Sequence, residues 1–438
     1  MKMNRIPLVL AITGLMAFAG CIVGAQSGSS PPSPPDDGGA EPTADAPSQP
    51  TASEPQAEEV KADPHGDVKR TDGAVKTYQD ANMMWHATML VTLVNGVAGF
   101  TEAAVSAGLP SGQVAIAGDD VGSYTISVGL EGRGLTEDLA KQELAKLTIE
   151  HSDVVKDGRL VLDTTVKHEP LLTVPLPTGG NANIDLPANW NANITEALPS
   201  FLSYDLDAGT ASGSVSAADL HGATASLSSA SGEVSASELT FDTIDLGAAS
   251  GTVQGARLTG REISVGTSSG SVQLSGVKAG TLEAGTASGS TAIQDATADV
   301  IDLSSSSGSI SLAGATAGAL HAGTASGNLD ASGTFDNIDV GASSGSVMIE
   351  ATPAATGTYD FGAASGSLKV KLGTGDGRAF DVEASTASGS VDISLPDSEQ
   401  VGDDSPRQQH VRTVGFDDAA IQTVITLDTS SGSIDVTG

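Results

Sequence analysis

Aromatic side chains are scarce in this sequence, at 3% of 438 residues, and charged side chains make up only 17%. A hydrophobic core must therefore be built from Val, Ile, Leu and Ala. Together with 53 glycines, this composition favours many short strands joined by tight turns and argues against a helical bundle. The length leaves room for two or three domains.

Basic residues are scarce too, because 20 Lys and Arg stand against 54 Asp and Glu, for a formal net charge of −34. Such a charge opposes direct electrostatic binding to nucleic acids or to anionic lipid headgroups. We therefore expect no nucleic-acid partner, and a soluble surface suited to salty or extracellular surroundings.

Cysteine is represented by Cys21 alone, so no intramolecular disulfide and no Cys/His zinc site can form. The seven histidines are scattered without the spacing of a metal site. The sequence therefore predicts no metal site, no cofactor and no catalytic residue.

Residues 1–20 are organised like an export signal. Basic residues precede an apolar run over residues 6–18, which is too short to span a bilayer stably. The motif Phe18-Ala19-Gly20-Cys21 resembles a bacterial or archaeal lipobox, although Phe18 stands where Leu is usual. We expect Cys21 to be lipidated and to anchor the protein in the cell envelope; ordinary secretion with cleavage near Gly24-Ala25 is the alternative.

Residues 21–75 follow as a segment rich in Pro, Ser, Ala and acidic residues. Such a composition lacks the apolar surface to offset the entropy of ordering, so we expect a disordered tether. Its reach as a coil is roughly 40 Å. A lipid followed by a spacer indicates a domain held away from a membrane.

Residues 76–200 have the composition of a small, folded, mixed β domain. Strands are expected over residues 85–94 and 123–130, and a short helix capped by Thr136 has acids in its first turn. Two further strands flank the Asp157-Gly158 turn as a hairpin. Five prolines make residues 170–199 a loop-rich junction.

A repeat begins near residue 201 and continues to residue 438. Its marker is the glycine after a Ser in phrases such as Thr-Ala-Ser-Gly-Ser, and the first six intervals between markers are each 19 residues. The markers, predicted to be structural corner residues, are Gly213, Gly232, Gly251, Gly270, Gly289, Gly308, Gly327, Gly345, Gly366, Gly389 and Gly432. The last gap is about two repeats long, which predicts one coil over residues 395–418 that has lost the motif and gained a loop.

Apolar residues alternate on both sides of each marker, as Ile263, Val265, Val272 and Leu274 do around Gly270. A period of two means two short strands, and a period near 20 means stacked units rather than a globular fold. We therefore predict an all-β solenoid whose coils consist of strand, corner, strand and return loop. Glycine permits the corner, its Ser and Thr neighbours can bond backbone groups, and small residues such as Ala211 are expected inside the bend.

The repeat resembles the "putative adhesin" domain family, a bacterial and archaeal family with Ser-Gly repeats and a β-solenoid fold. The resemblance covers about residues 85–438 and is strongest in LKVKLGTGDGRAFDVEASTASGSVDISLP (368–396) and IQTVITLDTSSGSIDV (421–436). It implies a surface or envelope protein, often a lipoprotein, with no catalytic residues to carry over.

Three classes of function follow from this pattern. The first is a non-catalytic envelope lipoprotein, an adhesin-like binding or structural module whose partner is an envelope protein, a glycan or another copy; an envelope-stress or signalling scaffold is its variant. The second is a polysaccharide-processing enzyme, which the few aromatics disfavour. The third is an ice-binding solenoid, suggested by a broken threonine column that includes Thr210, Thr267 and Thr286.

An acidic column is also expected on the outside. Six residues before the marker, between two inward apolar positions, stand Asp207, Asp245, Glu283, Asp302, Asp339, Asp360 and Glu383. This acidic stripe is interpreted as a solvated face, because one carboxylate per coil offers too few oxygens for calcium.

Overall fold

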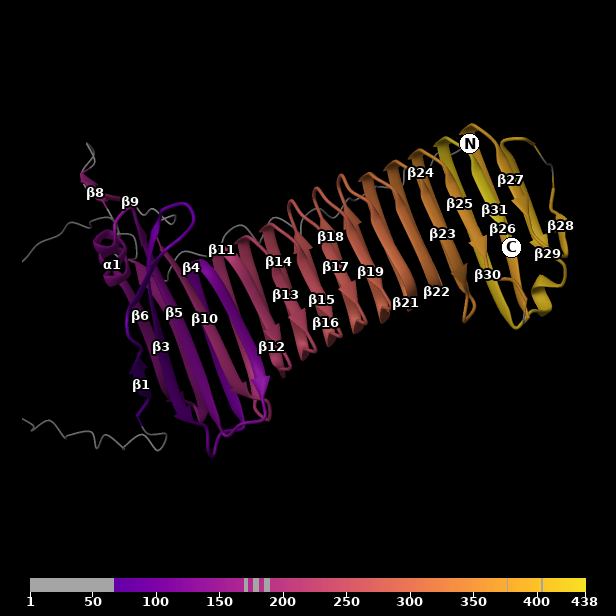
Figure 1. Cartoon of the computed structure of the whole chain (residues 1–438). Helices are drawn as coiled ribbons and strands as arrows, with labels where there is room; N and C mark the ends of the chain where they lie inside the picture. Colours follow the sequence, from indigo (N-terminus) through magenta and orange to yellow (C-terminus); the bar gives the residue numbers. More distant parts are fainter. Residues whose placement is uncertain (1–66, 169–171, 176–180, 185–189, 376, 403–404) are drawn as a thin grey trace, which may run out of the picture.

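The fold was analysed in a computed structural model that describes residues 67–168, 172–175, 181–184, 190–375, 377–402 and 405–438. Almost all of these residues are in strands, and the molecule is a long stack of coils with the one α-helix of the described chain at its N-terminal end (Figure 1). The predicted β-solenoid is therefore confirmed. Residues 1–66, with the expected signal and most of the expected tether, lie outside the described part. The prediction that the disordered tether runs to residue 75 is wrong at its end, because Lys69–Asp72 form a strand that pairs antiparallel with residues 91–94.

Most coils contribute one long strand before the marker glycine and one short strand after it. The long strands are β12 (His221–Ser231), β14 (Thr240–Ser250), β16 (Thr259–Thr267), β18 (Lys278–Thr286), β20 (Thr297–Ser305), β24 (Gly357–Ser365), β26 (Arg378–Ser388) and β30 (Ile421–Ser431). The short strands are β13 (Val234–Ser237), β15 (Val253–Ala256), β17 (Val272–Ser275), β19 (Thr291–Gln294), β23 (Val347–Thr352), β25 (Leu368–Leu372), β27 (Val391–Ser394) and β31 (Ile434–Thr437). Three strands continue around a corner: β11 (Ser203–Ala218), β21 (Ile310–Ser326) and β22 (Leu329–Ser344).

Each coil pairs in parallel with its neighbours, residue for residue. Ile263 of β16 lies opposite Ile244 of β14 and Leu282 of β18, and Val272 lies between Val253 and Thr291. Like therefore stacks on like, and Ile244, Ile263 and Leu282 are all fully buried. Burying each such side chain contributes about 1.5–3 kcal/mol.

The expected return loop is instead a tight corner. Arg257 has a left-handed backbone (φ 53°), and the next residue, Leu258, turns fully inward. The same corner recurs with Asp219, Glu238 and Asp295 at φ 57°, 55° and 54°. A second bend lies within the long strand, since Phe241 and Ile244 of β14 are both buried although three positions apart. Each coil thus has three flat sides, not two strands and a loop.

The marker glycines form a continuous column in which coils approach one another too closely for a side chain. A Cβ on Gly270 would lie 1.9 Å from the carbonyl oxygen of Gly251, and one on Gly251 would lie 1.8 Å from that of Gly232. Gly213 and Gly389 also have positive φ angles of 132° and 151°, but Gly270 does not. All marker positions therefore require glycine because there is no room for a Cβ. In some coils the positive φ angle is a second reason.

The solenoid begins earlier than the repeat suggested. Strand β4 (Glu102–Asp119) pairs in register with β11, so that Gly112 lies opposite Gly213 and Val114 opposite Val215. The Ser111-Gly112 pair is thus a marker in a segment assigned to the preceding domain. The expected boundary at residue 201 is corrected accordingly, because the first coil lies within residues 76–200.

The other N-terminal elements extend from this first coil. On one half of β4 lies the hairpin of β7 (Arg159–His168) and β6 (Leu147–Lys156), whose turn residue Asp157 has φ 54°. On the other half lie β10 (Trp190–Pro199), β5 (Ser123–Gly134) and β3 (Trp85–Gly96), the last flanked by β1 (Lys69–Asp72) and β2 (Lys76–Gln79). Helix α1 (Glu137–Ala145) begins at the predicted cap Thr136, whose hydroxyl accepts the Leu139 N–H at 3.3 Å. Strands β8 (Leu172–Pro175) and β9 (Asn181–Ile184) form a separate pair.

The C-terminal end departs from the expected order of coils. Residues 395–418 form no coil; they fold into β28 (Ser398–Gln400), β29 (Gln408–Thr413) and the 3-10 helix η2 (Phe416–Asp418), and β29 runs antiparallel along β26. Strand β30 then returns between β24 and β26, pairing in parallel with both. Gly432 accordingly lies between Gly366 and Gly389 in the glycine column, and we call this inserted β30–β31 coil the clasp (Figure 1).

We predict that Gly270→Ala is about as damaging as Gly270→Val, because the collision with the Gly251 carbonyl begins at Cβ. The expected loss is about 1–3 kcal/mol of unfolding free energy, typical of overpacking, and urea denaturation measures it. Ser271→Ala, at a half-buried hydroxyl one residue along, should cost less than about 0.5 kcal/mol. A harmless Gly270→Ala would show that the coils can separate at this corner.

For the clasp we predict that Leu427→Ala on β30 lowers the unfolding free energy by about 2–5 kcal/mol, since Leu427 is fully buried. Val424→Ala on the same strand, where the side chain is 46% exposed, is the control and should change little. Amide hydrogen exchange provides a second measurement: β30 amides should exchange as slowly as those of β24. Rapid exchange typical of a frayed chain end would contradict the insertion.

Candidate functional site

The threonine column of the sequence analysis faces the interior. Thr210, Thr267 and Thr286 are no more than 2% exposed, so they cannot contact ice. The Thr267 hydroxyl donates to the Gly251 carbonyl at 3.2 Å, and Ser229, at the same position of another coil, donates to Gly213 at 2.9 Å. These hydroxyls supply partners for corner carbonyls. Ala211, expected inside the bend, is exposed.

The acidic stripe does turn outward, as predicted: none of its carboxylates is buried, and neighbouring coils place Glu283, Asp302 and Asp339 in one register column with His321. Burial among the coils raises the pKa of Asp245 to about 6. Burial, reinforced by Asp339, also raises the pKa of Asp360. Among the described residues no three His, Cys, Asp or Glu side chains are grouped so that they could hold a metal ion.

A buried polar cluster lies where the N-terminal strands meet the first coil. Glu196 on β10 is fully buried, and neither carboxyl oxygen has a hydrogen-bond partner among the described residues. It lies opposite Ile116 of β4 and Ile126 of β5, in an interior column that is otherwise apolar around it. Desolvation raises its pKa to about 8, which Thr164 opposes and the Asp163 carboxylate reinforces.

Beyond these apolar neighbours, polar side chains of β5, β6 and β7 lie close to Glu196. The Thr164 hydroxyl on β7 lies 3.1 Å from Nδ1 of His151 on β6, and burial lowers the pKa of this histidine. Tyr124 on β5 donates its hydroxyl to Asp153, which also accepts from Asn95 at 2.9 Å. Burial raises the tyrosine pKa far above its ordinary range. These bonds connect β3 and β5 to the β6–β7 hairpin beside the buried Glu196 carboxyl.

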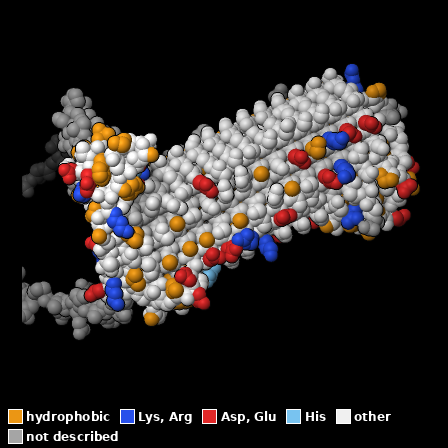
Figure 2. Space-filling view, viewed as in Figure 1, with side chains coloured by type: hydrophobic (Ala, Val, Ile, Leu, Met, Phe, Trp, Pro, Cys, Tyr) orange, Lys and Arg blue, Asp and Glu red, His pale blue; other side chains and the backbone are white. Residues whose placement is uncertain are grey.

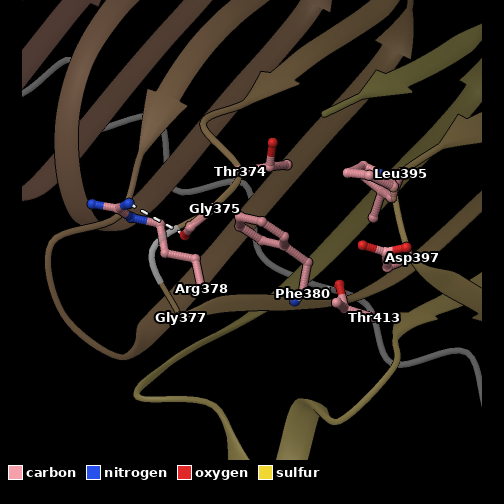
Figure 3. Close-up of a pocket in the computed structure, with 9 residues that line it drawn as sticks. Thr374, Gly375, Gly377, Arg378, Phe380, Leu395, Asp397 and Thr413 are labelled. Carbon is pink, nitrogen blue, oxygen red and sulfur yellow. Dashed lines mark hydrogen bonds between the residues drawn. The ribbon is translucent and has the colours of Figure 1, made fainter.

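One hollow, of about 160 Å³, lies under the C-terminal cap, between the loop after β25 and β29 (Figure 3). Phe380 and Leu395 form apolar walls, and Asp397 and Thr413 contribute oxygens. Arg378 at its edge donates to the Pro353 carbonyl at 2.8 Å and to that of Gly375 at 3.4 Å. Its guanidinium therefore holds the glycine-rich loop, and the hollow is a packing feature of the cap.

A second and larger hollow, of about 310 Å³, lies on the side of the stack formed by β13, β15, β17 and β19, which we call the short-strand face. Gln254, Gln273 and Gln294 project from it and are exposed. Its other lining residues are Ser, Ala, Gly and one Leu, so the lining carries no charge. Figure 2 shows this middle stretch of the face as uncharged, while charged side chains gather toward its C-terminal end and along its lower edge.

The predicted site residues thus have different outcomes. Cys21 lies outside the described residues, so its lipidation stays a prediction. The marker glycines come together in one column together with Gly112, which the pattern search missed because β4 stands far from the next copy in sequence. Glu196 was missed as well, although a single acid within the alternating stretch Trp190–Pro199 was a visible signal.

The stacked parallel coils, their glycine column and their apolar interior define a β-solenoid protein. This chain belongs to the Toastrack DUF4097 family, whose model matches residues 114–274 and 260–437. Curated proteins include no match to it.

Solved structures with a similar chain include a putative adhesin from Parabacteroides distasonis (14% identity, 65% of this chain and 93% of that one, TM-score 0.29). Another is a putative adhesin from Bacteroides fragilis (15% identity, 79% and 96%, TM-score 0.26). A third is a putative cell adhesion protein from Clostridium sporogenes (9% identity, 79% and 98%, TM-score 0.16).

The buried carboxyl predicts a pH dependence of stability. Glu196 is protonated in the folded protein up to about pH 8 but ionises near pH 4.5 when exposed. The folded state therefore binds one more proton between these values, and unfolding free energy should fall by about 1.4 kcal/mol per pH unit as pH rises. Glu196→Gln should abolish this fall.

Urea denaturation between pH 6.5 and 9 measures this fall in unfolding free energy. The window avoids the titrations of His151, whose pKa is lowered, and of Asp245, whose pKa is raised to about 6, because both act at lower pH. The exposed Glu233→Gln provides the matched control. An identical slope in wild type and Glu196→Gln would contradict the assignment.

Proposed function

We propose that this protein is a lipid-anchored envelope module with an adhesin-like binding or structural role and no catalytic activity. The observation that carries the proposal is the short-strand face of a long, stacked solenoid, on which β13, β15, β17 and β19 present uncharged Ser, Gln and Ala side chains in register. Such a surface suits contact with an extended partner. The lipobox-like motif ending at Cys21 and the tether behind it would hold this surface away from a membrane.

Three observations on the described chain bear on this assignment. No helix in the described ranges has the length and apolar character to cross a bilayer. Polysaccharide-cleaving enzymes need paired carboxylates flanking the scissile bond, whereas the larger hollow is lined entirely by uncharged residues. An ice-binding role is disfavoured because the threonine column that suggested it is buried in the interior.

We predict that Cys21→Ser transfers the protein from the membrane fraction to the soluble exported fraction, or blocks its maturation, because no acyl chain can then be attached. Fractionation of the native host, with the intact mass of the protein, measures this. Ser27→Ala, six residues further along, is the control and should remain membrane-bound. Unchanged fractionation and unchanged mass in Cys21→Ser would refute the anchoring half of the proposal.

Accessibility tests the binding half. Protease added to intact cells should remove the solenoid of the wild-type protein, and purified Cys21→Ser protein should bind again to stripped envelopes. Failure to rebind at any concentration would leave a structural role without an envelope partner.

A further inference from the structure

We propose that the hollow on the short-strand face binds a strand of uncharged polysaccharide. The inference rests on the proposed function and names the ligand class of its binding surface. It follows from the shape of the hollow, the chemistry of its lining and the charges around it.

The hollow crosses four coils in register. Gln254 of β15 lies between Ser235 of β13 and Gln273 of β17, and one column over, Ser275 lies next to Gln294 of β19. Successive coils lie about 4.8 Å apart, so these side chains form a ladder along the solenoid axis. A ladder of similar groups suits a polymer of repeating units better than a compact small molecule.

The lining can both donate and accept hydrogen bonds. The three glutamine amides make no hydrogen bond within the described part of the chain, so both ends of each amide remain available to a ligand. Serine hydroxyls beside them have the same dual capacity. Beside these groups, Ala256 and Ala292 contribute small apolar surfaces. Hydroxyl groups around a C–H face are the complementary features of a neutral sugar ring.

Charge selects among polymers. No lining residue is charged, in a chain whose net charge is −34, so the hollow offers no cation to an anionic polymer and the whole molecule repels one. A basic polymer would find its partners on the acidic stripe, along another side of the coils. An uncharged polysaccharide is neither repelled by the net negative charge nor drawn away to the acidic stripe.

The border of the hollow is charged and well defined. Glu233 directly precedes β13, and the Glu238–Arg257 ion pair lies at the corner that follows β13 and β15. Asp330 stands two coils beyond β19 in the register column of Ala292. The uncharged stretch is therefore a bounded patch and not a property of the whole face. The lining contains no aromatic side chain on which a sugar ring could stack, so each single contact is weak. Contacts from several coils acting together would supply the affinity.

Native affinity electrophoresis of the full-length Cys21→Ser protein tests the proposal, with dextran, mannan or laminarin as neutral probes and alginate as the anionic one. At least one neutral polymer should retard the protein, and alginate should not. Gln254→Glu with Gln273→Glu keeps the shape but adds two charges, and should raise the apparent dissociation constant about tenfold, as should the corresponding double alanine variant.

The control is Gln400→Glu with Gln408→Glu, which adds the same charge at exposed positions of the C-terminal cap and should bind like wild type. Retardation by alginate alone, equal binding by the Gln254/Gln273 variants, or no retardation by any neutral probe would overturn the proposal. So would self-association in sedimentation velocity that the two glutamates abolish, since the face would then bind a second copy.

The experiments distinguish a failure of this ligand site from a failure of the proposed function. Surface exposure and envelope rebinding that the Gln254/Gln273 variants leave unchanged would refute this ligand site and leave the proposed function standing. Absence of the wild-type protein from the envelope would refute the proposed function, and the purified protein would still report on the hollow.

Discussion

Coils of this solenoid approach one another most closely at the marker glycines, where the Cα of each coil faces the carbonyl oxygen of its neighbour. A Cβ there would lie between 1.5 and 2.0 Å from that oxygen in the coils from Gly213 to Gly432. The stack depends on this contact, because it lets identical positions fall into register. Register in turn places apolar residues, buried hydroxyls, carboxylates and glutamines in separate columns.

Register also accounts for the chemistry of the surfaces. A side chain that recurs at one position becomes a line on the outside of the molecule, whether acidic or uncharged. The column at Glu196 shows the reverse case, since one acid occupies an interior position that neighbouring coils fill with Ile116 and Ala217. Burial favours the protonated form of this acid in the folded protein, which couples the stability of the N-terminal junction to pH.

Much of this architecture was predictable from the sequence, because a strict period and alternation of two survive in every well-matched coil. The Thr136 cap and the Asp157-Gly158 turn were also predictable, because each depends only on a few neighbouring residues. What failed was non-local. Ser111-Gly112 has the same local pattern, with Val105 seven residues before the glycine and Val114 two after it, but it stands about 100 residues before the next marker, so only the pairing with β11 reveals β4 as a coil. The pairing of β30 with β24 and β26 likewise joins segments that are distant in the sequence. The hollow at Gln254 and Gln273 could be found only after the register was known, because the sequence shows each glutamine but not that the two lie side by side.

The clasp has a consequence for how the chain reaches this structure. In a simple solenoid each coil can dock as soon as it is made, on the coil before it. Here β26 and β27 leave the ribosome before β30 and β31, yet they belong one place further out in the stack. Gly389 and Gly432 carry the same marker, so the edge of β24 could accept either strand, and the native stack requires that β30 occupy it. The C-terminal coils therefore cannot be completed in the order of the chain: the place beside β24 has to be open when β30 has been synthesised.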